Sequence, residues 1–181
     1  MLFRSVVSLL ACFMHFYPKQ LPFNLIYAAT AEEEISGPNG IESVVEDLGC
    51  IDLAIVGEPT NMQMAVAERG LMVLDCEVSG KSGHVAHDEG ENAIYKALPI
   101  IEWFRNPGFP KVSDWLGEIK TTVSQISSGN QHNVVPDSCR FVVDVRTNGL
   151  YTNQEVLDYI RAHVQGKVEA RSLRQIGRAH V

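Results

Sequence analysis

The sequence predicts an α/β protein with two domains: one built on a mostly parallel sheet, and a ferredoxin-like β-α-β-β-α-β domain. Two nearly continuous apolar runs, residues 21–30 and 51–57, are typical of strands buried on both faces of a parallel sheet. From Gly70 onward, polar and apolar residues alternate, as in antiparallel strands with one exposed face. A chain of 181 residues with 45% hydrophobic content is expected to fold.

The first domain is predicted to span residues 1–69. Its start, residues 1–17, has a basic residue and an apolar run that fit either a signal peptide or a buried amphipathic helix. This run is too short to span a membrane. Between the two apolar runs, the Pro-Asn-Gly turn at 38–40 precedes a short helix with one apolar face, from Ile41 to Leu48. This order predicts a strand-helix-strand unit.

The second domain is predicted to span residues 70–174. We expect its strands at residues 70–80, 120–129, 138–147 and 167–173, and its helices at residues 92–104 and from Thr152 onward. Thr152 and Glu155 have the spacing of a capping box, which predicts where the second helix begins. Pro99 should kink or split the first helix, because proline lacks the N–H that the helix needs. The β-α-β-β-α-β order is the basis of the ferredoxin-like prediction.

Charge and cysteine content narrow the classes of partner. The net charge is −7 and no cluster of Lys and Arg offers a footprint for phosphates, so we expect no nucleic-acid partner. No apolar run is long enough for a membrane span, so we expect no membrane partner either.

The cysteines, which are scattered without paired spacing, suit core positions in a reducing compartment and hence the cytoplasm.

Carboxylates follow both apolar runs. Glu32, Glu33 and Glu34 come directly after the first run, and Glu58 follows the second. The carboxyl ends of strands in open α/β sheets are where ligands bind. Adjacent carboxylates repel one another, and divalent cations, zinc included, offset this repulsion by taking oxygen ligands. Taken alone, the three adjacent glutamates and the single Glu58 each fit a solvated acidic loop as well as a metal site.

A series of motifs carries a family resemblance. "ATAEEEISG", "GEPT", "GKSGHVAH", "HNVVPDSC" and "DVR" occur in this order along the chain. Together they resemble the co-catalytic zinc hydrolases that include acetylornithine deacetylases, succinyl-diaminopimelate desuccinylases, aminoacylases and glutamate carboxypeptidases, and acetylornithine deacetylases most of all. The resemblance covers the chain up to Arg174. It implies a partial zinc-peptidase α/β domain, followed by a lid domain through which the protein forms a homodimer.

The resemblance also implies a metal centre. Glu33 would be the general base, and Glu34 and Glu58 would bind two zinc ions, which Co²⁺ could replace; a shift of one residue, to Glu32 and Glu33, stays open. Paired metal ions lower the pKa of a bridging water toward ~7 and polarise an amide carbonyl. Glu33 would take the proton from that water and return it to the leaving amine.

Further site residues are implied in the second domain. His84 would reach across the dimer to stabilise the oxyanion in the partner's active site. Asn133 and Arg146 would contact the substrate, with the planar guanidinium suited to a carboxylate. For Arg146 the alternative is a surface salt bridge with Asp144, and we expect His87 to be a surface residue.

The chain departs from the family pattern at both ends. A His-x-Asp segment and a bridging Asp upstream, and a late His downstream, are absent. We therefore expect a fragment that is truncated at both ends and inactive alone. Residues 175–181, "QIGRAHV", match the translation of a common sequencing adapter, so we expect them to be a non-native tail.

The function expected of the parent enzyme is hydrolysis of the amide bond of an N-acyl amino acid, a small molecule such as N-acetyl-ornithine, in arginine synthesis. A dipeptidase or carboxypeptidase with the same metal centre is one alternative. A non-catalytic dimerisation module is another, because the lid domain is complete while the metal site is not. A small secreted binding protein is a third, and it depends only on the apolar N-terminus.

Overall fold

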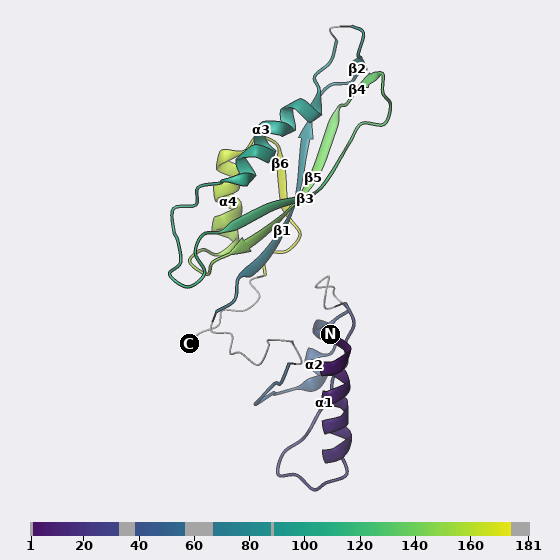
Figure 1. Ribbon diagram of the computed structural model, residues 1–181, viewed down its shortest axis with the longest axis vertical. Helices are drawn as coiled ribbons and strands as arrows, with labels where there is room; N and C mark the ends of the chain where they lie inside the picture. The colour runs from purple at the N-terminus through teal and green to yellow at the C-terminus, as the bar shows by residue number, and fades with distance from the viewer. Residues whose placement is uncertain (1, 33–38, 57–66, 88, 175–181) are drawn as a thin grey trace. The chain divides into compact units, whose positions relative to one another are not determined.

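The computed structural model of this chain describes residues 2–32, 39–56, 67–87 and 89–174. The chain divides into two compact units, Met1–Met64 and Ala65–Val181 (Figure 1). The proposed tail, residues 175–181, lies outside the described residues.

The first unit is dominated by the helix α1, Leu2–Phe16. The segment that follows returns along this helix: the Tyr27 ring lies 5.7 Å from the Phe13 ring, and the Tyr27 hydroxyl donates to the Val6 carbonyl at 3.4 Å. The short helix expected after the Pro-Asn-Gly turn is divided into a 3-10 turn, η2 (Ile41–Ser43), and a short helix, α2 (Val45–Leu48). Among the described residues, no helix is long and apolar enough to cross a membrane.

The parallel sheet predicted for this unit is not found in its described part. Residues 21–30 and 51–56 are not in strands. The side chains of Leu53, Ile55 and Val56 are 80%, 76% and 81% exposed. Parallel strands are stable when other elements cover both of their faces, and nothing in the described part of this unit covers the second run. An apolar run alone was therefore insufficient to form a strand.

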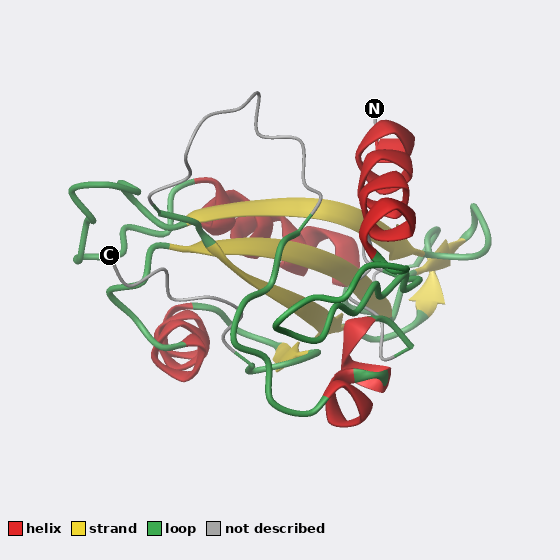
Figure 2. Ribbon diagram, turned by 90° about the horizontal axis from the view of Figure 1, so that it is seen from below, coloured by secondary structure: helices red, strands yellow, loops and turns green. Residues whose placement is uncertain are grey.

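The second unit is built on a four-stranded antiparallel sheet with strand order β3-β5-β1-β6 (Figures 1 and 2). The strands are β1 (Gly70–Ser79), β3 (Lys120–Ser128), β5 (Ser138–Thr147) and β6 (Lys167–Ala170), and the helices are α3 (Ala93–Arg105) and α4 (Asn153–His163). Two short strands, β2 (Gly83–His84) and β4 (Val134–Val135), pair separately. The predicted α/β composition and the antiparallel pairing are confirmed.

Alternation along the strands separates a buried face from an open face. In β1, Met72, Leu74, Cys76 and Val78 are buried, whereas the residues between them are exposed or half-buried. The buried side chains share one core with the inward faces of both helices, including Phe104 of α3 and Ile160 of α4. Burying a large apolar side chain contributes about 1.5–3 kcal/mol. Hydrophobic burial therefore stabilises this unit on one face of the sheet only.

The two helices begin at side-chain caps. The Asn92 side chain accepts from the Ile94 N–H at 2.9 Å at the start of α3. α4 begins with the predicted capping box: the Glu155 N–H donates to the Thr152 hydroxyl at 3.1 Å, and the Thr152 N–H donates to the Glu155 carboxylate at 2.7 Å.

We expected Pro99 to kink or split this helix, and Pro99 does not split α3. The lost hydrogen bond weakens the helix locally. However, Ala97 and Ile100, on either side of the proline, are buried in the same core. Their packing holds both halves of the helix against the sheet.

Candidate functional site

The predicted base and metal ligands, Glu33, Glu34 and Glu58, lie outside the described residues. Glu32 is described, with a left-handed backbone at φ 59°. Its carboxylate accepts from the Asn39 backbone N–H at 3.0 Å and from the Asn39 side-chain amide at 2.8 Å. The Glu32 carboxylate is therefore held by two hydrogen bonds from Asn39.

The described residues do not form a metal centre. Within residues 2–32, 39–56, 67–87 and 89–174, no group of three His, Cys, Asp or Glu side chains is placed to hold a metal ion. The residues present there do not by themselves fit two zinc ions.

His84 lies on a compact loop between β1 and α3. At the base of the loop, Lys81 and Glu91 exchange two backbone hydrogen bonds of 2.8 Å. Gly83 and His84 then pair with Val135 and Val134 of β4. The backbone of His84 is therefore anchored on both sides.

Two glycines allow the loop to close this tightly. A Cβ atom on Gly83 would lie 1.9 Å from the Glu89 carbonyl oxygen, and one on Gly80 would lie 2.1 Å from the Glu91 carbonyl oxygen. Real Cβ atoms are not found at such distances, so only glycine fits at these two positions. Their role was not predicted from the sequence, although both occur in the "GKSGH" motif and glycine often marks a close backbone approach.

The imidazole of His84 is exposed and oriented by its own turn. Its Nδ1 accepts from the Ala86 N–H at 3.2 Å, and the His87 N–H donates to the His84 carbonyl at 3.0 Å. In the neutral ring this arrangement places the proton on Nε2. Nε2 is then a hydrogen-bond donor that faces away from the turn. His87 is exposed, as predicted, with its ring 5.5 Å from that of His84.

Asn133 lies beside His84. It directly precedes β4, and its backbone carbonyl accepts from the Val85 N–H at 3.2 Å. The structure therefore brings two of the predicted site residues, His84 and Asn133, together at one end of the second unit, on the arm formed by β2 and β4.

Arg146 lies on the open face of β5, opposite Leu71 of β1. Its Nε donates to Asp144 Oδ1 at 2.7 Å, and its Nη2 donates to Asp144 Oδ2 at 2.9 Å. These hydrogen bonds raise the pKa of the Arg146 guanidinium above its ordinary value. The ion pair that the sequence offered as the alternative for Arg146 is therefore present.

Arg146 is distant from His84 and Asn133 in the same chain. β5 pairs with β1 from Ser138, beside the β2–β4 arm, to Thr147 at the opposite end of the sheet. At ~3.4 Å per residue, roughly 27 Å of strand separates Arg146 from Ser138. Within one chain, the predicted substrate-binding residues Asn133 and Arg146 therefore do not come together in a single site.

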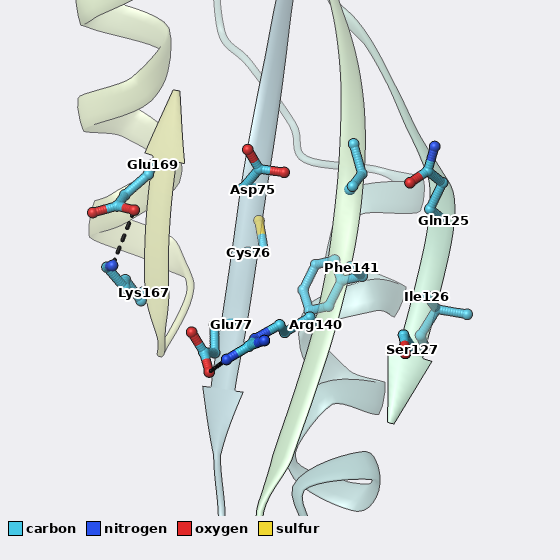
Figure 3. A pocket seen from close by; sticks show the side chains of 11 residues that line it. Asp75, Cys76, Glu77, Gln125, Ile126, Ser127, Arg140, Phe141, Lys167 and Glu169 are labelled. Carbon is cyan, nitrogen blue, oxygen red and sulfur yellow. Dashed lines mark hydrogen bonds and ion pairs between the residues drawn. The ribbon is translucent and has the colours of Figure 1, made fainter. Parts of the chain in front are cut away.

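A shallow hollow of about 410 Å³ occupies the middle of the open face (Figure 3). The charged side chains around it are paired: Glu77 with Arg140 at 3.1 Å, and Lys167 with Glu169 at 3.0 Å. The hydrogen bond from Arg140 is the main cause that lowers the pKa of Glu77. None of the predicted site residues lines this hollow.

A family model described as the peptidase dimerisation domain of the M20 type matches residues 66–171. This chain belongs to the M20 peptidase dimerisation domain family. Acetylornithine deacetylase of Myxococcus xanthus is 35% identical over 147 residues, which are 76% of this chain and 38% of that protein. Succinyl-diaminopimelate desuccinylase 2 of Ruegeria sp. (strain TM1040) is 26% identical over 152 residues, 78% of this chain and 38% of its own length.

The M20 chain thus spans well under half the length of these curated relatives. The resemblance predicted from the motifs is confirmed at the level of the family. A solved structure, the aminopeptidase PepT of Bacillus cereus, aligns with a TM-score of 0.45 at 18% identity, over 60% of this chain and 30% of its own.

Proposed function

We propose that this M20 chain is part of a hydrolase that cleaves the amide bond of an N-acyl amino acid, in the manner of acetylornithine deacetylase. The family match over residues 66–171 carries the proposal, and the 35% identity to the Myxococcus xanthus enzyme favours this substrate class. Glu33 as general base, and Glu34 and Glu58 as zinc ligands, belong to the proposal because of the motifs in which they occur. So does a place in arginine synthesis in the cytoplasm.

The second unit is proposed to form a homodimer through the edge strand β3. Of the two edges of the sheet, β3 has nine residues and β6 has four. A long edge strand leaves unpaired N–H and C=O groups that another chain can satisfy. A two-fold axis between two β3 strands would extend both sheets in antiparallel fashion.

This pairing would also complete the site. It would place the His84 end of one subunit beside the Arg146 end of its partner, which supports a composite active site. His84 would then donate from Nε2 to the developing oxyanion, Asn133 would contact the substrate beside it, and Arg146 of the other subunit would bind the substrate carboxylate. The separation of these residues within one chain is the observation that favours this arrangement.

Mixed dimers test the composite site directly. In an enzyme that contains this sequence, His84→Ala and Arg146→Met should each abolish hydrolysis of N-acetyl-ornithine. If two inactive variants exchange subunits at random, half of the dimers are mixed and carry one intact site. Activity should then return to about a quarter of the wild-type value. No recovery after verified exchange would contradict the composite site, and hydrolysis of dipeptides alone would favour the peptidase alternative.

A non-catalytic dimerisation module is the second candidate. It is favoured by the core of the second unit, which is formed by that unit's own strands and helices. A stable dimer of this chain that contains no zinc by elemental analysis would support it. Stoichiometric zinc would support the hydrolase.

A further inference from the structure

Lys120 and Arg146 lie side by side on the open face of the sheet. They are directly opposite each other in the antiparallel pair of β3 and β5, so their Cβ atoms lie on the same face, ~4.5–5.5 Å apart. Both side chains are exposed. Leu71, the partner of Arg146 on β1, continues the row with an apolar side chain.

Among the described residues, Lys120 differs from the other cations of this face. Arg140, Lys167 and Arg171 each have a carboxylate within 3.1 Å, contributed by Glu77, Glu169 and Asp75. Within the described part of the chain, Lys120 has no carboxylate within 4.0 Å. Lys120 and Arg146 are both positive, and like charges placed directly opposite each other on a sheet repel. The Asp144 carboxylate forms an ion pair with Arg146 only.

Asp144 also limits how Arg146 can bind a ligand. It takes the Nε–H and one N–H of Nη2. The remaining donors of the guanidinium, on Nη1 and the other N–H of Nη2, point away from Asp144. A ligand anion would meet this outer edge of Arg146, and the Lys120 ammonium is the nearest additional charge on β3.

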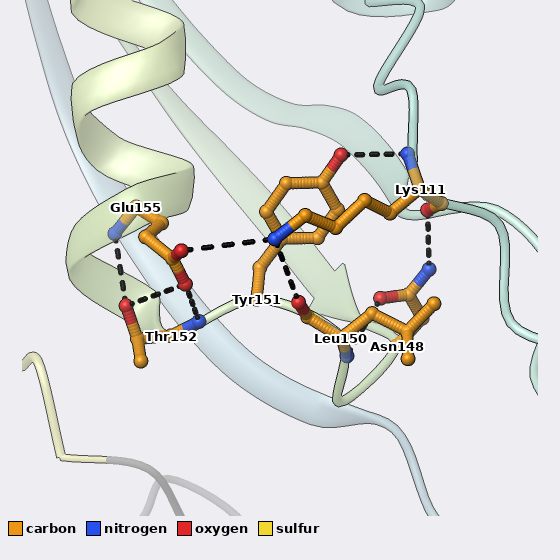
Figure 4. A network of polar contacts seen from close by, with 6 residues as sticks. All are labelled: Lys111, Asn148, Leu150, Tyr151, Thr152 and Glu155. Carbon is orange, nitrogen blue, oxygen red and sulfur yellow. Dashed lines mark hydrogen bonds and ion pairs between the residues drawn. The ribbon is translucent and has the colours of Figure 1, made fainter.

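The backbone around this pair is held in place. The Asn148 side-chain amide, two residues after Arg146, donates to the Lys111 carbonyl at 3.0 Å (Figure 4). The same amide donates to the Gly117 carbonyl at 2.9 Å. Arg69 donates to the carbonyl of Glu118, two residues before β3, at 2.6 Å. These contacts join the loop that enters β3 to the ends of β1 and β5, so the register of Lys120 and Arg146 is fixed from both sides.

We propose that Lys120 and Arg146 together bind one carboxylate of the substrate, with Arg146 donating from its outer edge and Lys120 donating from its ammonium group. Lys120 is then a further substrate-binding residue. The inference rests on the proposed function, since it takes the bound anion to be the carboxylate of an N-acyl amino acid. It predicts that substrates with a free carboxylate are preferred over the matching amides.

Binding of N-acetylglycine to the 181-residue chain tests this inference. NMR titration at low salt should show saturable shifts at Arg146 and Lys120, and the neutral analogue N-acetylglycinamide should leave these signals unchanged. Lys120→Met should raise Kd about fivefold, the effect of removing one exposed charged partner, and Lys120→Arg should restore much of the binding. Lys167→Met, on the same face, is the matched control and should leave Kd unchanged.

Each result separates this inference from the proposed function. If Lys120→Met leaves Kd within twofold while Arg146→Met abolishes binding, Lys120 has no role and the role of Arg146 stands. If the folded wild-type chain does not bind N-acetylglycine, or binds the amide equally well, the carboxylate site is refuted. The mixed-dimer assay then tests the proposed hydrolase activity independently of this binding result. Amide spectra that match the wild type would show that each variant is folded.

Discussion

Replacing Gly83 by alanine should open the loop that carries His84 and leave the sheet intact. The new Cβ would lie 1.9 Å from the Glu89 carbonyl oxygen, a backbone atom that cannot rotate away. The loop must therefore move, and the contact that yields is the pair of backbone hydrogen bonds between Lys81 and Glu91 at its base.

The size of this effect follows from the free energy that those two hydrogen bonds contribute. Each contributes about 0.5–1.5 kcal/mol, so the free energy of opening the loop should fall by about 1–3 kcal/mol. Protection of the Lys81 and Glu91 amides against hydrogen exchange should then fall roughly 5- to 150-fold. Protection in the core strands should not change, because local opening does not require global unfolding.

Hydrogen exchange followed by NMR measures this effect at individual amides. Ser82→Ala, in the same loop and at an exposed position, is the matched control and should change protection less than threefold, the effect of about 0.5 kcal/mol. Unchanged protection of Lys81 and Glu91 in Gly83→Ala would refute the argument. It would show that the loop accommodates a Cβ without losing its base.

Three further predictions concern stability, its dependence on pH, and thiol chemistry. Thr152→Ala removes the cap of α4 and should cost about 1 kcal/mol, which lowers Tm by about 4–8 °C; a change below 1 °C would contradict it. Backbone and side-chain hydrogen bonds from Thr152 lower the pKa of Glu155, so its contribution is present above the ordinary value of 4.5 and is lost as the pH falls below it. Glu155→Gln can keep the hydrogen bonds without the charge. This variant should therefore be less stable than the wild type at pH 7, and equally stable well below pH 4.5, where Glu155 is protonated. A thiol reagent at pH 8 should modify the two exposed cysteines of the native chain rapidly, and the two buried ones only after denaturation, because burial raises the pKa of Cys76 to about 12. The exposed pair is Cys12 and Cys50, and the buried pair is Cys76 and Cys139. Rapid reaction of all of them would contradict the core described for the second unit.

Local patterns in the second unit predicted its elements well. The alternation in residues 138–147 coincides with β5, and the spacing of Thr152 and Glu155 marks the start of α4. Both signals depend on neighbours within a few positions along the chain, and that is why the sequence alone reveals them. The ferredoxin-like name, which depends on more than these local signals, stays a prediction.

The first unit shows where such patterns are insufficient. Residues 21–30 and 51–56 are apolar enough for buried strands, yet they are not strands in the structure. A strand needs hydrogen-bonding neighbours, and a parallel strand also needs cover on both faces. Neither requirement can be inferred from the run itself.

The sequence by itself determined the family, the antiparallel α/β character of the second unit, and the identities of His84, Asn133 and Arg146 as candidates. The tertiary structure alone decided that His84 and Asn133 share one arm, that Arg146 lies at the other end of the sheet, and that Lys120 is its neighbour. The reason is physical. A motif records residue types along the chain, whereas proximity depends on strand register, which is set by hydrogen bonds and core packing between segments far apart in the sequence.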